Sequence, residues 1–149
     1  MIYEKVSDAL TIKELDIDDL AQAFPVVSQL RTHLSVEEYV KIVKAMKPSG
    51  YRAICLFEGE DIVAYAGFAE QLNLYNGNHI WVYDLVTDEA KRSKGYGQLV
   101  LSCIEKYAKE QALTCVVLSS RLQWLDAHHF YEKLMGYEKT SYTFKKQII

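Results

Sequence analysis

The stretch Arg92-Ser93-Lys94-Gly95-Tyr96-Gly97 stands where the hydrophobic pattern of the chain changes from that of a strand to that of a helix. Residues 79–87 before it are a long apolar run that predicts a β-strand. Residues 99–112 after it place apolar side chains at helical spacing, with charged side chains opposite them. Residues 114–118 are again short, apolar and β-rich, which predicts a buried strand. Together these segments predict one strand–helix–strand unit joined by a glycine-bearing turn.

The composition of this turn is typical of an anion site. Backbone N–H groups at the start of a helix have no intrahelical partner, and the helix dipole adds partial positive charge there. Gly95 and Gly97 let a bulky anion approach the backbone, while Arg92 and Lys94 add full positive charge. An ordinary turn with solvated basic side chains has the same residues, but the position between a strand and a helix favours a phosphate cradle. The chain lacks the G-x-G-x-x-G and G-K-[ST] patterns of dinucleotide and nucleoside-triphosphate sites.

Upstream of the turn, the sequence predicts an antiparallel meander. Residues 51–58, 62–74 and 79–87 are three successive strand-like runs. Short turns with Gly59 and with the pair Asn76-Gly77 separate them, and an Asn-Gly pair favours a hairpin turn. Residues 9–15 alternate apolar and polar side chains, which predicts a further strand before the meander.

Two helices are predicted between the first strand and the meander. Acidic residues within 16–19 place negative charge at the start of a helix that runs to about residue 30, with a break at Pro25. Ser35 and Glu38 have the spacing of a capping box for a second helix. Near the C-terminal end, a helix is expected from Asp126 to Gly136, followed by a last strand over residues 137–149.

The composition places the chain among single globular domains. It has 149 residues, of which 50% are hydrophobic and 12% aromatic, and this excludes a disordered or low-complexity protein. The expected organisation is one domain over residues 1–149. The net charge of −3 gives no reason to expect binding to nucleic acid or to a membrane surface. No apolar run of about 18 residues occurs, so no membrane span is predicted.

Cysteine usage and the N-terminus indicate a cytoplasmic protein. The three cysteines, Cys55, Cys103 and Cys115, are odd in number and widely spaced, and no C-x-x-C pattern occurs. A disulfide framework or a metal cluster is therefore not expected. The first ten residues contain Glu4 and Asp8 and have no long apolar core, so they do not predict a signal peptide.

The sequence resembles the GCN5-related N-acetyltransferase (GNAT) superfamily. Members carry R/Q-x-x-G-x-G/A after the fourth strand, and Arg92, Gly95 and Gly97 match that motif. Residues 126–137 resemble a later family motif, D-A-H-R-F-Y-E-K-L-G-Y, with Met135 as one additional residue. The order of the predicted elements also matches over nearly the whole chain. The resemblance implies an α/β (α+β) fold with a mixed, mostly antiparallel central sheet and helices on both faces.

The resemblance also implies a cosubstrate, acetyl-coenzyme A, and no metal. In the family, backbone N–H groups of the cradle hold the pyrophosphate; the corresponding residues here are Arg92, Ser93, Lys94, Gly95, Tyr96 and Gly97. The end of the fourth strand, here Leu85, Val86 and Thr87, offers backbone groups to the pantetheine arm where the fourth and fifth strands diverge. The N–H of Val86 is then placed to polarise the thioester carbonyl.

Two side chains match family positions that take part in catalysis. Tyr131 corresponds to a tyrosine that protonates the departing thiolate, although a core tyrosine on an aromatic helix would look the same. A phenol has an ordinary pKa of about 10, so sharing a proton with a thiolate is chemically reasonable. Asp84 lies where some polyamine-acetylating relatives carry an acidic residue. It is expected to attract the acceptor ammonium or to accept its proton through water, unless it is simply a paired carboxylate.

These inferences predict an enzyme that transfers an acetyl group from acetyl-coenzyme A to a primary amine by direct attack on the thioester. A small amine is the expected acceptor, and a homodimer is a further expectation. A protein N-terminal or lysine acetyltransferase is an alternative, as is a non-catalytic sensor domain that binds acetyl-coenzyme A or coenzyme A. Aromatic residues Tyr75, Trp81, Tyr83 and Trp124 either line an acceptor pocket or fill the core or a dimer face.

Overall fold

Three long antiparallel strands form the centre of the protein, whose computed structural model describes residues 1–149. Strands β3 (Arg52–Glu58), β4 (Asp61–Asn73) and β5 (Gly77–Thr87) follow one another as a meander. Gly59 in the first turn has a φ of +62°, and Gly77 in the second has a φ of +67°. Such left-handed values are readily adopted only by glycine. The meander predicted from the sequence is therefore confirmed.

Shorter strands lie on both sides of the meander. β1 (Tyr3–Lys5) and β2 (Leu10–Glu14) extend the sheet beyond β3, and β6 (Val116–Leu118) lies beside β5, so the strand order is β1-β2-β3-β4-β5-β6. β1 was not predicted because three residues are too few to show a period. The expectation that residues 114–118 are buried was wrong, since β6 is only half-buried. The reason is its place at the edge of the sheet, where one side has no neighbouring strand.

The two predicted helices before the meander pack on one face of the sheet. A 3₁₀ segment, η1 (Ile17–Ala23), leads directly into α1 (Phe24–Leu30), and α2 (Val36–Met46) ends in a 3₁₀ turn, η2 (Lys47–Ser49). The break expected at Pro25 is seen as the change from η1 to α1, with proline in the first turn of the α-helix. The capping box is confirmed, since Ser35 Oγ accepts from the N–H of Glu38 at 3.1 Å and the Glu38 carboxylate accepts from the N–H of Ser35 at 3.0 Å.

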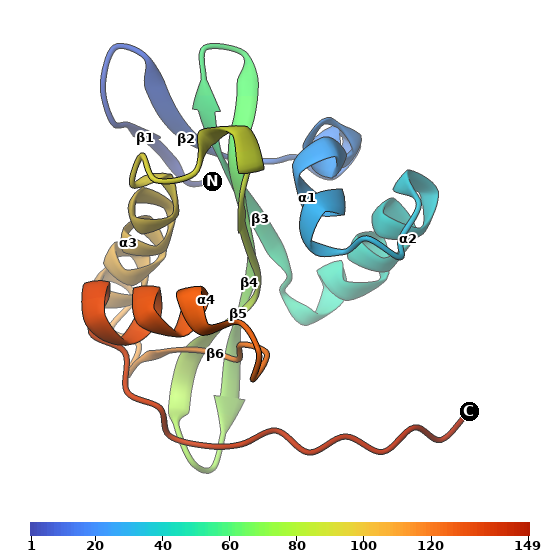
Figure 1. Ribbon diagram of the computed structural model, residues 1–149, viewed down its shortest axis with the longest axis vertical. Coiled ribbons are helices and arrows are strands. Elements are labelled where there is room, and N and C mark those ends of the chain that lie inside the picture. The colour runs from blue at the N-terminus through green and yellow to red at the C-terminus, as the bar shows by residue number, and fades with distance from the viewer. The chain divides into compact units, whose positions relative to one another are not determined.

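The other face of the sheet is covered by α3 (Tyr96–Glu110), which follows a short 3₁₀ turn, η3 (Glu89–Lys91). The buried side chains of α3 recur at helical spacing, as the sequence predicted: Tyr96, Val100, Leu101, Cys103, Ile104 and Ala108. Figure 1 shows α3 on one side of the meander and α1 with α2 on the other. The predicted class, a mostly antiparallel sheet with helices on both faces, is confirmed.

Residues 1–117 and residues 118–149 form two separate compact units. The second unit contains α4 (Leu125–His129), which continues as a π-helical turn, η4 (Phe130–Leu134). In this turn the N–H of Met135 donates to the carbonyl of Phe130 at 3.0 Å, five residues back. A π turn accommodates one more residue than an α turn. The wider turn is therefore the structural counterpart of the additional Met135, and Gly136, with a φ of +73°, ends the segment as predicted.

The last strand expected over residues 137–149 was wrong. Those residues belong to no strand and no helix. A strand exists only where backbone groups pair with a neighbour, and these residues form no ladder. None of the helices in the protein has the length and apolar character needed to cross a membrane.

Candidate active site

A β-bulge in β5 positions Asp84. Gly67 on β4 pairs with Asp84, but the next residue, Phe68, pairs with Val82, so Tyr83 is an extra residue on β5. A Cβ added to Gly67 would lie 1.7 Å from Tyr51 Oη and 2.8 Å from Asp84 Oδ2. Gly67 therefore leaves the space in which Tyr51 and Asp84 meet. Bulges of this kind commonly redirect a side chain beside a functional site.

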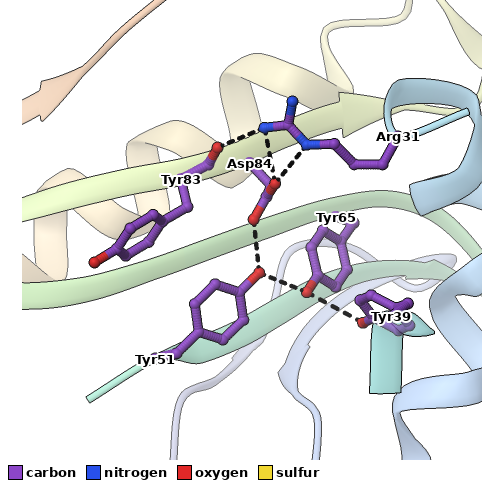
Figure 2. Close-up of polar contacts among 6 residues, drawn as sticks. All are labelled: Arg31, Tyr39, Tyr51, Tyr65, Tyr83 and Asp84. Atoms are coloured by element: carbon purple, nitrogen blue, oxygen red, sulfur yellow. Dashed lines mark hydrogen bonds and ion pairs between the residues drawn. The ribbon is translucent and has the colours of Figure 1, made fainter. Parts of the chain in front are cut away.

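The Asp84 carboxylate is held by side chains from two other elements, as Figure 2 shows. Tyr51, just before β3, donates a hydrogen bond from its hydroxyl to Asp84 Oδ2 at 2.7 Å. Arg31, immediately after α1, donates from Nε to Asp84 Oδ1 at 3.0 Å, and its Nη2 lies 3.0 Å from the same oxygen. Arg31 Nη2 also donates to the carbonyl of Tyr83 at 3.0 Å. The acidic residue predicted from the sequence is thus a paired carboxylate at the bulge.

Two more tyrosines extend this network into the core between the sheet and α2. The Tyr51 hydroxyl lies 2.8 Å from the Tyr65 hydroxyl, which accepts a hydrogen bond from Tyr39 at 3.1 Å. Burial raises the pKa of all three phenols above the ordinary tyrosine value, and the nearby Asp84 carboxylate raises the pKa of Tyr51 further. All three hydroxyls therefore keep their protons at neutral pH. Tyr51 donates to Asp84, and Tyr65 and Tyr39 support Tyr51 through a chain of hydrogen bonds.

The predicted phosphate cradle lies at the open start of α3. Gly95 is the N-cap residue with a φ of +79°, and an added Cβ there would meet no atom within 4 Å. No side chain caps this helix, and its first turn contains no acidic residue. Helix α2, in contrast, has its first N–H groups satisfied by its own Ser35 and Glu38. The free N–H groups of α3 are therefore available to an external anion.

The basic side chains of the cradle form no hydrogen bond or ion pair within the fold. Arg92 and Lys94 are exposed and form no ion pair, and the exposed Ser93 between them has a φ of +68°. A left-handed serine costs about 1 kcal/mol. Tyr96 differs from these residues because its side chain is buried and serves as an anchor. Gly97 lies in the first turn of α3.

Glu58, at the end of β3, holds the segments on both sides of the cradle. Its carboxylate accepts a hydrogen bond from the Tyr96 hydroxyl at 2.6 Å and one from Lys91 Nζ at 2.8 Å. The hydrogen bond from Lys91 and that from Tyr96 lower the pKa of Glu58, so the carboxylate stays ionised at neutral pH. Residues 92–95 therefore span a gap whose two ends are tied to one side chain.

The strand end expected to bind the pantetheine arm follows Asp84 directly. Leu85, Val86 and Thr87 pair with residues of β4 on one edge. On the other edge of β5, the N–H of Ile80 donates to the carbonyl of Cys115 at 3.0 Å, which attaches the β6 segment near the start of β5. Divergence of the two strands toward Thr87 stays a prediction.

Tyr131 lies in the second unit, within the π turn. Its ring contacts the rings of Phe130 and Tyr137, with centroid distances of 5.3 Å and 6.1 Å. The carbonyl of Tyr131 accepts from the N–H of Tyr137 at 2.8 Å. Burial raises the pKa of the Tyr131 phenol, so it carries a proton at neutral pH as a general acid must.

A pocket of about 220 Å³ lies on the strands that precede Asp84 in the sheet, and Trp81 and Tyr83 are among its lining residues. Its walls come from β4 and β5: Gln71, Leu72, Asn73, His79, Trp81 and Tyr83. The Tyr83 ring, which lines this pocket, lies 5.7 Å from the ring of Tyr51, the residue that bonds Asp84. Of the four aromatics predicted from the sequence, Trp81 and Tyr83 line this pocket. Tyr75 is exposed beyond it, and Trp124 belongs to the second unit.

Four residues of the site were missed by reasoning from the sequence: Arg31, Tyr51, Glu58 and Gly67. Arg31 and Asp84 are 53 positions apart, and no spacing signal connects them. Gly67 had a detectable signal, because a glycine inside a strand often marks a bulge or a close approach.

The family comparison agrees with this fold. The sequence model of the acetyltransferase (GNAT) family matches residues 15–137. The chain belongs to the GNAT family and is an acetyl-coenzyme A-dependent acyltransferase. A curated relative, the uncharacterized N-acetyltransferase YhdJ of Bacillus subtilis (strain 168), is 38% identical over 140 residues, covering 93% of this chain and 96% of that protein.

Solved structures of two enzymes share the fold. The aminoglycoside N-acetyltransferase AAC(6')-Iy in complex with CoA has a TM-score of 0.82 at 8% identity, covering 97% of this chain and 99% of that one. The ribosomal-protein-alanine N-acetyltransferase of Brucella melitensis biovar Abortus 2308 has a TM-score of 0.77 at 16% identity, covering 93% of this chain and 100% of that one. At these identities the similarity establishes the fold alone.

Proposed function

We propose that the protein acetylates a primary amine of a small molecule, by direct attack of the amine on the thioester of acetyl-coenzyme A. The observation that carries this proposal is the uncapped start of α3, with exposed Arg92 and Lys94 beside it and open space at Gly95. Free N–H groups and two cations suit the pyrophosphate of the cosubstrate. The first turn of α3 contains no acidic residue, and the neighbouring Glu58 carboxylate is already paired with Lys91 and Tyr96.

The end of β5, which follows the bulge, is proposed to bind the thioester arm of the cosubstrate. Backbone groups of Leu85, Val86 and Thr87 bind the pantetheine arm, and the N–H of Val86 stabilises negative charge on the thioester oxygen. Asp84, one residue earlier, orients the acceptor amine or takes its proton through water. Tyr131 gives a proton to the departing thiolate; its family motif and its place in a π turn, a feature that is frequent at functional sites, support this role.

A small acceptor is proposed because Trp81 and Tyr83, the latter one residue before Asp84, line a pocket of about 220 Å³, which suits a compact ligand. No metal is proposed for the reaction, since the residues form no group of three potential metal ligands. The whole chain is proposed to act as one catalytic domain in the cytoplasm; its three free cysteines suit a reducing compartment. The expected homodimer stays a prediction.

The test combines binding and turnover on the full chain. Calorimetry with acetyl-coenzyme A is expected to show one site per chain, and an amine panel assay is expected to show release of free coenzyme A with a small primary amine. The panel includes a lysine peptide and an alanine-terminated peptide, since faster transfer to either would replace the small-molecule proposal by a protein substrate. Tight binding without transfer to any amine would instead indicate a sensor domain.

A further inference from the structure

The charged group that faces the solvent beside Asp84 is Arg31. Its Nε and Nη2 are used by Asp84 and by the carbonyl of Tyr83, and the third nitrogen, Nη1, has no partner. Figure 2 shows this nitrogen pointing away from Asp84. The Arg31 side chain remains 32% exposed, whereas that of Asp84 is only 17% exposed. A ligand that approaches the bulge therefore meets unused guanidinium donors on the more exposed member of the pair.

The guanidinium is held in a fixed orientation before any ligand arrives. Two of its nitrogens bond a carboxylate and a carbonyl that belong to the same strand, β5. A side chain already ordered loses little further conformational entropy when it binds another group. Nη1 is thus preorganised to donate to an oxyanion, because arginine is suited to carboxylate and phosphate groups.

The charge balance at the bulge also disfavours a purely cationic acceptor. The Asp84 charge, which alone would attract an ammonium group, is compensated by Arg31 at 3.0 Å. Helix α1, Phe24–Leu30, which leads into Arg31, contains no charged residue that could offset the guanidinium. A second cation near Nη1 is repelled, whereas an oxyanion is attracted.

The position of the pair along β5 connects it with the reaction. Asp84 precedes Val86 by two residues, which is about 7 Å along a strand. An amine that attacks a thioester held at Val86 would therefore lie about this distance from the backbone of Asp84. An oxyanion a few bonds from that amine comes within range of Arg31.

We propose that Arg31 is a specificity-determining residue that binds an oxyanion on the acceptor, so that the substrates are amines that also carry a carboxylate or phosphate group. This inference rests on the proposed function, because it places the acceptor beside Asp84. It replaces the expectation of a simple cationic amine, which took Asp84 as an uncompensated charge.

The experiment compares matched amines that differ in the oxyanion. Amino acids are compared with their amides, and O-phosphoethanolamine with ethanolamine, which separates carboxylate from phosphate; spermidine represents cationic amines. For the wild-type protein, kcat/KM is expected to be about 10-fold or more higher for the member that carries the oxyanion than for its partner without one. Arg31→Met should abolish this ratio, and Arg31→Lys should retain part of it.

Arg52→Met is the matched control, since Arg52 also pairs with a carboxylate, Glu14, at 2.7 Å. It removes an arginine–carboxylate pair without touching Asp84, so the ratio should stay as in the wild type. Calorimetry of the same amines in the presence of coenzyme A gives a readout that does not need turnover. If no amine is acetylated but the anionic preference in binding is lost in Arg31→Met, the proposed function fails and the role of Arg31 stands.

Three outcomes would overturn the inference. The first is a wild-type preference for spermidine or for the neutral partners. The second is an equal loss of kcat/KM for both amines of a matched pair, in Arg31→Met and in Arg31→Lys. That result would indicate that the Arg31–Asp84 ion pair is purely structural. The third is the absence of binding by every anionic amine. Circular dichroism of each variant identifies a folding defect, and Arg31→Lys then decides the question.

Discussion

Gly95 combines a left-handed backbone, with a φ of +79°, and open space where a Cβ would be. Its substitution therefore has two separable effects, strain in the backbone and obstruction of a ligand that approaches α3. Gly77 has a similar φ of +67°, and its added Cβ would make only an ordinary contact, 3.8 Å from Thr114 Cγ2. Gly77 starts β5, whereas the cradle follows the end of that strand.

Gly95→Ala and Gly77→Ala are both expected to lose about 1 kcal/mol in the free energy of unfolding, because each forces alanine into the left-handed region. Only Gly95→Ala should also weaken binding of acetyl-coenzyme A, by about 10-fold, measured by calorimetry; the loss corresponds to about 1.4 kcal/mol. Equal affinities in the two variants would count against the cradle.

The proposed role of Tyr131 depends on its hydroxyl group alone. Tyr131→Phe is expected to lower kcat by about 100-fold, the order contributed by a positioned general acid, with little change in the affinity for acetyl-coenzyme A. Because burial raises the pKa of Tyr131, the wild-type rate should not fall from loss of this proton until the pH exceeds about 10. Tyr142→Phe, on an exposed side chain, is the control. Wild-type turnover in Tyr131→Phe would remove the acid role.

The two helices that begin near the sheet differ in what satisfies their first N–H groups. In α2 the chain supplies its own cap, and in α3 it does not. At the scale of elements, the turn before α3 is held by the end of β3, because Glu58 bonds both Lys91 and Tyr96. The element that carries the cradle therefore depends on another element for its shape.

Glu58→Gln is expected to raise the KM for acetyl-coenzyme A several-fold while kcat changes little. A neutral amide pairs less well with Lys91, so the flanks of the cradle loosen while the reacting groups stay in place. Glu60→Gln, two residues on in the exposed turn, is the matched control and should behave as wild type. Steady-state kinetics at varied acetyl-coenzyme A gives both constants. A fall in kcat alone would show that Glu58 does not act through the cradle.

At the scale of the whole molecule, three buried phenols link the core to Asp84. Their pKa values are raised by burial, so the folded protein keeps these protons at a pH where the unfolded chain, with tyrosines near pKa 10, loses them. Their contribution to stability is thus fully present below pH 10 and is lost as the pH rises above it.

The free energy of unfolding is expected to fall above pH 10 by up to about 1.4 kcal/mol per pH unit for each phenol. Urea unfolding of the wild type and of Tyr39→Phe at pH 8 to 11 checks this. Above pH 10, the free energy of unfolding of Tyr39→Phe should fall less steeply with pH than that of the wild type, by the contribution of one phenol. Below pH 9 the two proteins should show the same pH dependence. Parallel curves over the whole range would show that Tyr39 is not a protonated core residue.

The sequence by itself determined the meander, the capped helix α2, the amphipathic helix α3 and the glycine-bearing turn before it, because each depends on local periodicity or turn chemistry. It also singled out Asp84, through the resemblance, as a candidate site residue. It failed over residues 137–149, where a strand was predicted but no neighbouring strand is present to pair with it. The burial of β6 was predicted wrongly for a related reason, since the burial of a strand depends on the elements that lie beside it.

Only the tertiary structure decided what Asp84 is. Its partners come from the end of α1 and the start of β3, and the space for them comes from a glycine on β4. Contacts between residues so distant along the chain leave no periodic trace, because they arise from how the elements pack and not from the pattern within any one of them. The bulge at Tyr83 and the compensated charge at Arg31 became visible only when these elements were brought together.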